Sequence, residues 1–467
     1  MAPQRQTGTP HPASGSRPDV RRAALEILDT LEQSNQTLDS AMQAAFDRAE
    51  VWSKRDRALL NALVYGVLRW RGRLDYIISR HSKTRLSRID PSVLNILRLG
   101  LFQIGYLNRI PGFAAVTTSV ELVKSTSAPW AFGFVNAVLR SVARPYPEVV
   151  FPDVQKDPVA SLAATKSFPQ WLIRRWLVKS DPERTAALCD AINAIPAITL
   201  RTNTLLVDRF TLAAALENEV ENIELTAWAP DGVSIMNPLE PIPLMAPYRA
   251  GWFQVQDEAA QLVALFLNPQ PGETILDACA GLGGKTGHIA QLMNNNGTIV
   301  ALDKNKEKLS RLHLQMHRMA VSIVTTVTHD LNTPLEGYNR GHFDRILLDA
   351  PCSGLGVIRR NPDIKWNTAE KQLTRHGSRQ LEFLDKLSHL VKPSGLLVYA
   401  VCSNETEENE DVTNNFLRRH PEFALDPLAG RLSSKASELI DDKGYLKTSP
   451  YPYKMDGFFG ARFKRIR

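Results

Sequence analysis

Residues 345–354 read RILLDAPCSG, and this stretch decides the interpretation of the C-terminal half of the chain. A run of branched apolar residues, typical of a buried strand, ends at Asp349 and is followed by a proline and Cys352. Similar runs predict further strands at 274–278, 298–303, 323–330, 396–403 and 457–463. Helical patterns separate several of these runs, beginning near Lys285, Lys306 and Ala369. Strands that alternate with helices predict a doubly wound α/β domain with a parallel sheet.

Polar side chains stand at the ends of these predicted strands. In chain order they are Asp277, Asp303, Asp330, Asp349 with Cys352, and Cys402. A single acid at a strand end is often only the cap of the next helix. In open α/β sheets, however, ligands bind beyond the carboxyl ends of the strands, and a whole series of such residues favours a binding site there.

The loop after the first of these strands reads DACAGLGGKTGH and is rich in glycine. Its glycines would let a ligand approach the backbone just before a helix N-terminus. The end of the loop matches a phosphate-binding P-loop, but Cys279 occupies the position of the first glycine. A dinucleotide-binding loop is also a poor match, because Thr286 stands where its last glycine belongs.

Two acids point to a ligand that has a ribose and an adenine but no phosphate. Asp303 ends the second strand, where an acid binds ribose hydroxyls in related folds. Asp330 follows the third strand and could meet an adenine edge. We therefore predict S-adenosylmethionine as the cofactor.

The thiols suggest chemistry on a pyrimidine. A cysteine thiolate can add to C6 of the ring, which makes C5 nucleophilic toward the methyl group of a sulfonium. Asp349 could assist the addition from near N3, and Cys352 and Cys402 could divide attack and release between them. Buried, inert cysteine is the competing interpretation. Loop residues after Cys352 and the polar SNETEENE after Cys402 argue against it, although the residues alone do not say which thiol attacks.

The N-terminal part of the chain predicts a helical bundle. Apolar residues recur at helical spacing from residue 21 to about 145, and Asp90 followed by Pro91 predicts the start of a helix. Arg69 and Arg73 share a helix face near Trp70. Together with other arginines they suggest a surface for a phosphate-rich partner, the whole group being Arg55, Arg57, Arg69, Arg71, Arg73, Arg88, Arg98 and Arg109.

Composition divides the chain into five parts. Residues 1–20, rich in Pro, Ser and Gly, predict a disordered tail, and the helical domain follows at 21–145. The proline-rich stretch 146–164 predicts a linker. Residues 165–250 predict a small α+β domain, and residues 251–467 the α/β domain.

Charge and cysteine usage exclude several classes of protein. Four cysteines without a C-x-x-C pair predict neither a disulfide framework nor a metal site, and they suit a reducing cytoplasm. No run of about 18 apolar residues occurs, so we expect no membrane association. The net charge of +7 is compatible with a nucleic-acid partner. We expect a cytoplasmic monomer.

The C-terminal motifs resemble the RNA cytosine-C5 methyltransferase family of the NOL1/NOP2/Sun type. The resemblance rests on VQDEAAQLVALFL, DACAGLGGKT, ALDKN, LLDAPCSGLGVIRRNPDIKW, YAVCSNETEENE and DGFFGARF. PAITLRTN, at 196–203, is similar to the small domain of the same family. LVYGVLRWRGRLD, LRLGLFQIGYL, IPGFAAVTTSVELVK and FVNAVLR resemble the RNA-binding helical domain of the antitermination factor NusB.

The resemblance implies roles for matching residues. Cys402 corresponds to the nucleophile of the RNA enzymes, Cys352 to the residue that aids proton loss and release, and Asp349 to the acid at the target base. It also implies a Rossmann-like fold and a cytosine of 16S rRNA as substrate, position 967 by the type of enzyme. The implied cofactor-binding residues are Cys279, Ala280, Gly281, Leu282, Gly283, Gly284, Lys285, Asp303, Asp330 and Asp349.

The cofactor loop departs from the family pattern. That pattern usually reads C-A-A-P-G-G-K-T, whereas Gly281 and Leu282 replace alanine and proline in this chain. Loss of the proline removes some preorganisation of the loop, which bears on the affinity for the cofactor and not on its identity. Two alternatives to the methyltransferase remain at this point: a P-loop-type NTPase that acts on RNA, and a non-catalytic RNA-binding factor.

Overall fold

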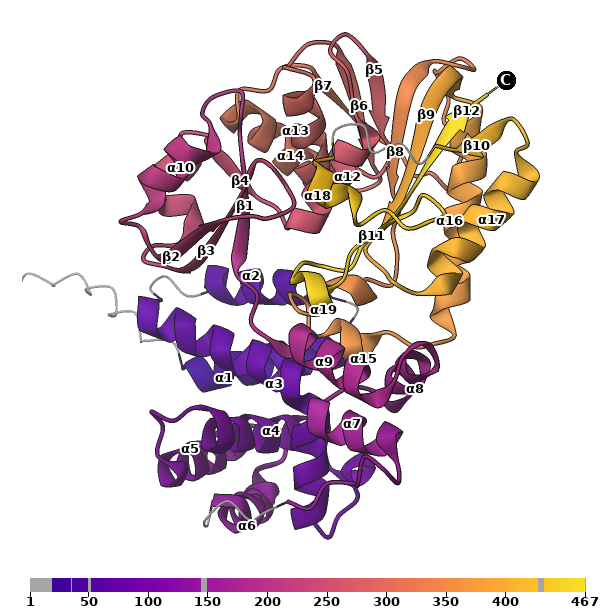
Figure 1. Ribbon diagram of the computed structural model, residues 1–467. Coiled ribbons are helices and arrows are strands. Elements are labelled where there is room, and N and C mark those ends of the chain that lie inside the picture. The colour runs from indigo at the N-terminus through magenta and orange to yellow at the C-terminus, as the bar shows by residue number, and fades with distance from the viewer. Residues whose placement is uncertain (1–18, 35, 49–51, 144–148, 427–431, 467) are drawn as a thin grey trace, which may run out of the picture. The chain divides into compact units, whose positions relative to one another are not determined.

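The computed structural model describes residues 19–34, 36–48, 52–143, 149–426 and 432–466 (Figure 1). Residues 1–18 of the predicted tail therefore lie outside the described residues, and the first helix begins at Val20. The described chain divides into two units, one ending at Ala186 and the other beginning at Ala187. The division falls inside helix α9 (Pro182–Asn193).

The N-terminal unit consists of helices alone among its described residues (Figure 1). They are α1 (Val20–Gln33), α2 (Leu38–Arg48), α3 (Lys54–His81), α4 (Pro91–Tyr106), α5 (Gly112–Lys124), α6 (Phe132–Ala143), α7 (Pro158–Lys166) and α8 (Gln170–Lys179), with short 3-10 turns η1 (Leu86–Arg88) and η2 (Pro129–Ala131). Asp90 caps α4 as expected, because its carboxylate accepts hydrogen bonds from the backbone N–H groups of Ser92 and Val93. The predicted helical bundle is confirmed.

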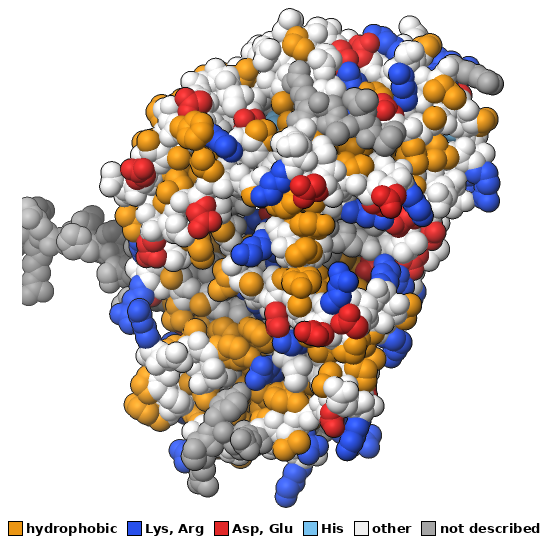
Figure 2. Space-filling view, in the orientation of Figure 1, with side chains coloured by type: hydrophobic (Ala, Val, Ile, Leu, Met, Phe, Trp, Pro, Cys, Tyr) orange, Lys and Arg blue, Asp and Glu red, His pale blue; other side chains and the backbone are white. Residues whose placement is uncertain are grey.

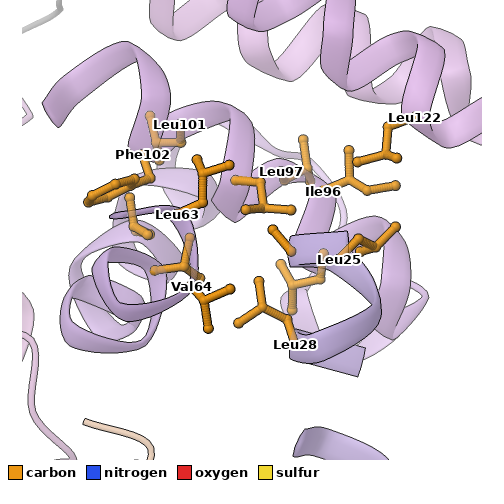
Figure 3. Close-up of a cluster of buried hydrophobic side chains, with 14 of the residues drawn as sticks. Leu25, Leu28, Leu63, Val64, Ile96, Leu97, Leu101, Phe102 and Leu122 are labelled. Carbon is orange, nitrogen blue, oxygen red and sulfur yellow. The ribbon is translucent and has the colours of Figure 1, made fainter. Parts of the chain in front are cut away.

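The core of this bundle is built from the helix faces that the apolar spacing indicates. Figure 3 shows side chains of α1, α3, α4 and α5 directed toward one another, among them Leu28, Leu63 and Leu97. All three are at most 3% exposed. Burial of such side chains stabilises the unit by about 1.5–3 kcal/mol each.

Part of the predicted linker is helical. Residues 144–148 lie outside the described residues, but α7 starts at Pro158 with Asp157 as its N-cap. The hydroxyl of Ser167, which follows α7, accepts a hydrogen bond from the backbone N–H of Gly72 in α3 (2.9 Å). Residues 158–164 therefore belong to the packed helical unit, and the linker prediction is wrong for them. Pro158, one of the prolines that suggested a linker, stands at the N-terminus of a helix, where proline is tolerated.

The arginines of this unit do not all face solvent. Arg98 on α4 is 3% exposed and bonds Asp75 and Glu32, and Arg69 on α3 is buried, which lowers the pKa of its guanidinium. The prediction of a shared phosphate-binding face is wrong for these two residues. Arg55, Arg57, Arg88 and Arg109 are exposed. On the face seen in Figure 2, lysine and arginine side chains are interspersed with acidic and apolar ones.

The second unit starts with a small antiparallel sheet. Its strands are β1 (Ile198–Thr202), β2 (Val220–Leu225), β3 (Gly232–Pro238) and β4 (Phe253–Val255), in the order β2-β3-β1-β4. Helices α10 (Arg209–Leu216) and α11 (Ala246–Arg249) and the turn η3 (Ile242–Leu244) complete this region. The sequence predicted β1, α10 and β2 but not β3 and β4.

The larger sheet has the order β10-β12-β9-β8-β5-β6-β7, and β11 pairs with β12 (Figure 1). Its strands are β5 (Thr274–Asp277), β6 (Thr298–Asp303), β7 (Val324–Thr328), β8 (Phe343–Asp349), β9 (Val391–Val401), β10 (Phe423–Leu425), β11 (Leu446–Lys447) and β12 (Phe459–Arg465). Strands β5 to β9 run parallel to one another, whereas β12 runs antiparallel to β9, β10 and β11. The sheet is therefore mixed rather than parallel throughout.

Helices cover both faces of this sheet, and successive residues of one strand serve opposite faces. Ile275 packs among residues of α12 (Glu258–Leu267), α13 (Gly284–Leu292) and α14 (Lys306–Arg318), whereas Leu276 packs among residues of α16 (Gln372–Ser388) and α17 (Glu410–Arg419). This period of two is the strand pattern. Shorter elements are η4 (Leu355–Val357), α15 (Ile364–Asn367), η5 (Thr406–Glu408), α18 (Ser434–Ser437) and α19 (Pro450–Tyr453).

The chain order of the strands creates a switch point. Strand β5 lies between β6 and β8, so the chain leaves the middle of the sheet in one direction and later returns to the other side. Loops at the carboxyl ends of β5 and β8 then diverge and leave a crevice, the usual ligand site of such sheets. The expected combination of a helical part, a small α+β part and a doubly wound α/β part is confirmed.

Candidate active site

A pocket of about 370 Å³ lies beyond the carboxyl ends of β5, β6, β8 and β9. Seven of the residues predicted for the site line it: Cys279, Gly281, Asp303, Asp330, Asp349, Cys352 and Cys402. Ala280, Leu282, Gly283 and Gly284 do not line this pocket, and Lys285 reaches its edge through Asp349. The volume is within the range of small-molecule sites.

Glycine shapes the loop between β5 and α13. Gly281 has a φ of +56°, and its backbone N–H donates to Oδ2 of Asp303 at 3.0 Å. Gly283 has a φ of +84° at the start of α13, and a Cβ there would lie 2.6 Å from Cγ of Leu312. Both positions favour glycine, because other residues rarely adopt positive φ values. The side chain of Leu282 is 51% exposed and belongs to a different pocket, beside Arg311.

An ion pair joins this loop to the next strand end. Nζ of Lys285 lies 2.6 Å from Oδ2 of Asp349. Burial alone would lower the pKa of Lys285, but the negative charge and hydrogen bond of Asp349 outweigh it and raise that pKa. The ammonium is therefore kept charged inside the protein, next to the carboxylate that faces the pocket.

The two predicted thiols lie side by side at the ends of neighbouring strands. Sγ of Cys352 is 3.2 Å from Sγ of Cys402, within hydrogen-bond distance for sulfur. Their loops are also joined through the backbone, because the N–H of Gly356 donates to the carbonyl of Cys402 at 2.9 Å. A Cβ on Gly356 would lie 1.9 Å from the carbonyl oxygen of Gly457, so only glycine fits at this crossing.

The protonation of Cys352 is set by its surroundings. The hydrogen bond with Cys402, burial, and the negative charges of Cys402 and Glu408 raise the pKa of the Cys352 thiol well above its ordinary value. Burial also raises the pKa of Cys279, on the cofactor loop. Both groups are thus held as neutral thiols at neutral pH.

One strand-end acid faces away from the pocket. Asp277 at the end of β5 is 1% exposed, and its Oδ2 accepts a hydrogen bond from the hydroxyl of Thr286 at 2.7 Å. Burial raises the pKa of Asp277 to about 7, although the bond from Thr286 opposes this shift. The expectation that all of the strand-end acids converge on one site is therefore wrong for Asp277. Its carboxylate instead bonds Thr286 in α13, directly after the glycine loop.

Other lining residues were missed by sequence reasoning. Arg379 and Phe383 enter the pocket from α16, Lys304 and His329 from the loops after β6 and β7, and Lys308 from the first turn of α14. Asp330 lies at this end, and the backbone N–H of Asn332 is the main cause of its lowered pKa. Lys304 follows Asp303 directly and could have been found from the strand end. The spacing of apolar and polar residues along α16 does not indicate which of its turns reaches the pocket.

Comparison with known proteins identifies the family. The family model for 16S rRNA methyltransferase RsmB/F matches residues 264–464. The probable ribosomal RNA small subunit methyltransferase B of Bacillus subtilis is 36% identical over 94% of this chain and 97% of the relative. This chain belongs to the RsmB/F family of 16S rRNA methyltransferases.

Further matches cover the rest of the RsmB/F-type chain. The NusB family model matches residues 18–144, and the ferredoxin-like domain model of RsmF/B-type methyltransferases matches residues 168–241. The ribosomal RNA small subunit methyltransferase B of Pseudomonas putida is 32% identical over 96% of this chain and 98% of its own length. The NusB-like and methyltransferase assignments made from the sequence are confirmed, and neither an NTPase nor a non-catalytic factor fits them.

Solved structures are similar as well. The crystal structure of PH0851 covers 95% of this chain and 98% of its own, with 27% identity and a TM-score of 0.79. A methyltransferase homolog from Pyrococcus horikoshii covers 66% of this chain and 99% of its own, with 25% identity and a TM-score of 0.55.

Metal-binding clusters and membrane-spanning helices are both missing from the residues that the structure describes. Within the ranges that the structure describes, no cluster of three or more His, Cys, Asp or Glu side chains could hold a metal ion. No helix in the same ranges is both long and apolar enough to cross a membrane.

Proposed function

We propose that this protein transfers a methyl group from S-adenosylmethionine to C5 of a cytosine in 16S rRNA, through a covalent bond between Cys402 and C6 of the base. The observation that carries the proposal is the pair of thiols 3.2 Å apart, which line the same pocket as Asp349. The relatives named as small subunit methyltransferase B support 16S rRNA as the substrate. Position 967, a cytoplasmic location and a monomeric state are parts of the same proposal.

The pocket residues fit S-adenosylmethionine. Asp303 holds the glycine loop through Gly281 and offers its carboxylate at the end of β6, where an acid binds ribose hydroxyls. Phe383 supplies an apolar surface and Asp330 an acceptor for the adenine. Once bound, the cofactor supplies an electrophilic methyl group.

Asp349 and Lys285 would hold the target base. Cytosine has an amino group that donates and an N3 that accepts hydrogen bonds. The carboxylate would accept from the amino group, and the adjacent ammonium makes a proton available to N3 as the ring is attacked. A group placed for proton transfer in this way typically accelerates a reaction about 10²–10⁴-fold.

The two thiols would divide the covalent steps. The thiolate of Cys402 forms the bond to C6, and the electron pair displaced from the C5–C6 double bond makes C5 the nucleophile. After C5 has been methylated, its proton leaves to a base, the double bond re-forms, and the C6–sulfur bond breaks. The Cys352 thiol, held neutral by its raised pKa, would aid this release by hydrogen bonding to the departing sulfur of Cys402.

The test uses undermethylated small-subunit rRNA with S-adenosylmethionine and compares the wild type with Cys402→Ala and Cys352→Ala. We expect 5-methylcytosine from the wild type only. Cys402→Ala should form neither product nor adduct, and Cys352→Ala should accumulate a protein–RNA adduct that survives denaturation. Mass spectrometry of nuclease fragments locates the methyl group.

The opposite pattern, with adducts only in Cys402→Ala, would make Cys352 the nucleophile. Methylation of another atom or base by the wild type would contradict C5 chemistry altogether. Cys189 is buried outside the pocket, so Cys189→Ala is a matched control that should keep full activity.

A further inference from the structure

Behind the two thiols lies a buried glutamate that lines no part of the pocket. Glu408, the last residue of η5, is 0% exposed. Its Oε1 accepts a hydrogen bond from the backbone N–H of Ser353 at 2.8 Å. Its Oε2 accepts from the hydroxyls of Ser353 at 2.5 Å and Ser403 at 2.6 Å. One carboxylate thus bonds the residue after Cys352 and the residue after Cys402.

These contacts join two loops that are far apart in the sequence. Ser353 follows Cys352 after β8, and Ser403 follows Cys402 after β9. Both oxygens of Glu408 are engaged by donors, which is the pattern of a carboxylate that serves as an acceptor at two places at once. A shorter or differently placed acceptor could bond one loop but not both.

The glutamate is itself held in place by α16 and β9. The side-chain amide of Gln380 donates to Oε1 of Glu408 at 3.2 Å and to the carbonyl of Pro351 at 3.0 Å. The hydroxyl of Tyr399 lies 2.5 Å from the backbone carbonyl of Glu408. Close approach of η5 to α16 depends on Gly377, where a Cβ would lie 2.1 Å from the carbonyl of Glu407.

We propose that Glu408 is a positioning residue of the methyltransferase site. Its buried carboxylate fixes the Cys352 and Cys402 loops against each other. It thereby sets the distance between the two thiols and determines which step each of them performs. The inference rests on the proposed function insofar as those thiols carry the reaction. A placement error of about 1 Å can cost about 100-fold in rate, so a residue that never touches substrate can control the chemistry.

The charge of the carboxylate adds a second effect. The negative charge of Glu408 is one of the causes that raise the pKa of Cys352. Glu408 therefore helps to keep Cys352 as a proton-bearing thiol. Other ionisable groups around Cys352 are Cys402, Cys279, Asp349, Lys285, Arg379 and Tyr399.

Two substitutions of Glu408 separate the effect of side-chain length from the effect of side-chain charge. Glu408→Gln keeps the length of the side chain and removes its charge, whereas Glu408→Asp keeps the charge and shortens the side chain by one methylene. The first readout is alkylation of Cys352 by iodoacetamide as a function of pH, followed by mass spectrometry in a Cys402→Ala background. We expect Glu408→Gln to lower the pH midpoint for alkylation of Cys352 and Glu408→Asp to leave it unchanged.

The second readout reports the distance between the thiols. Diamide converts two neighbouring thiols to a disulfide and takes up their two hydrogens, and neither RNA nor S-adenosylmethionine is needed. We expect the Cys352–Cys402 disulfide to form at least about 10-fold more slowly in Glu408→Asp than in the wild type, because the shorter side chain cannot hold both loops. Methyl transfer should fall in parallel.

Ser388→Ala is the matched control. It removes a buried hydroxyl of α16 that bonds the backbone carbonyl of Asp385, and it leaves every contact of Glu408 in place. It should lower the thermal midpoint but change neither the alkylation midpoint nor the disulfide rate. If either glutamate variant does not fold, Ser353→Ala with Ser403→Ala removes the hydroxyl contacts and should slow disulfide formation in the same way.

Unchanged disulfide rates in Glu408→Asp and in the double serine variant would overturn the positioning role. An unchanged alkylation midpoint in Glu408→Gln would overturn the effect of charge. Because both assays run without RNA, they are decided separately from the proposed function, which fails only if the wild type transfers no methyl group to cytosine C5.

Discussion

In the helical unit, the Arg98 side chain is 3% exposed and bonds Asp75 and Glu32, whereas in the α/β sheet the Asp349 side chain is 29% exposed and opens into a pocket. Both are charged residues within otherwise apolar segments, and in the sequence both suggested a binding role. The guanidinium has its partners within its own bundle, while the carboxylate stands at a strand end where side chains from several strands meet. A charged residue is a candidate for catalysis when it stands at the carboxyl end of a parallel strand, where ligands bind. Its charge alone does not distinguish it from a residue with a structural role.

The largest effect that sharpens this contrast is expected at Arg98. Arg98→Ala would leave Asp75 without the guanidinium whose Nε and one terminal nitrogen bond both of its oxygens, whereas Glu32 would keep its ion pair with Arg71. Breaking such a buried ion pair costs about 3–5 kcal/mol. Urea unfolding followed by circular dichroism should show this loss in the helical unit. Arg88→Ala, at an exposed position, should change stability by less than about 0.5 kcal/mol.

The opposite outcome is expected at Asp349. Asp349→Asn should lower the rate of methyl transfer at least about 100-fold, because the amide supplies no negative charge beside Lys285 and the base. Cofactor affinity, measured by calorimetry with S-adenosylmethionine, should change much less. The contrast between the two regions would break if Asp349→Asn unfolded the protein while Arg98→Ala abolished activity without loss of stability.

A smaller effect tests the strand-end acid that turns inward. Asp277 has a pKa raised from 3.8 to about 7, so the folded state binds its proton more tightly than the unfolded state does. Its contribution to stability is complete below about pH 4 and is lost as pH rises through 7. Asp277→Asn should remove this dependence and raise stability at pH 8 by more than about 1 kcal/mol. Parallel denaturant curves for the two proteins from pH 5 to 8 would count against the buried, protonated carboxyl.

The smallest effect is expected in the cofactor loop. Leu282→Pro restores the proline common in the family and should reduce the freedom of the loop before the cofactor binds. Stabilisation by a compatible proline is about 0.4–1 kcal/mol, which corresponds to about two- to five-fold tighter binding of S-adenosylmethionine. Titration calorimetry resolves a change of this size. Weaker binding would mean that the loop needs the conformation that Leu282 adopts.

Much of the α/β sheet could be predicted because its strands are buried on both faces and read as continuous apolar runs. The strands missed, such as β4 (Phe253–Val255) and β11 (Leu446–Lys447), are short and antiparallel, and they are defined by their partners more than by their composition. Residues 158–164 were taken for a linker because prolines precede a short helix whose apolar face is narrow.

The sequence predicted the site residues that stand at strand ends. It did not predict the direction in which a side chain points from its helix or strand. Asp303, Asp349, Cys352 and Cys402 follow from the strand ends and line the pocket. Whether an end residue such as Asp277 faces in or out depends on the exact register, which apolar runs do not reveal. Arg379 reaches the pocket from a helix that is distant in sequence, and only tertiary packing shows it.

Strand β12 lies between β9 and β10, although it is the last strand of the chain, and Gly457 just before it presses on Gly356 in the Cys352 loop. Because β9 carries Cys402 at its end, the strand that leads to that thiol has an unpaired edge until β12 is added. Strand β12 therefore completes the sheet beside Cys402, and without it the edge of β9 would present unpaired backbone N–H and C=O groups next to the thiol pair.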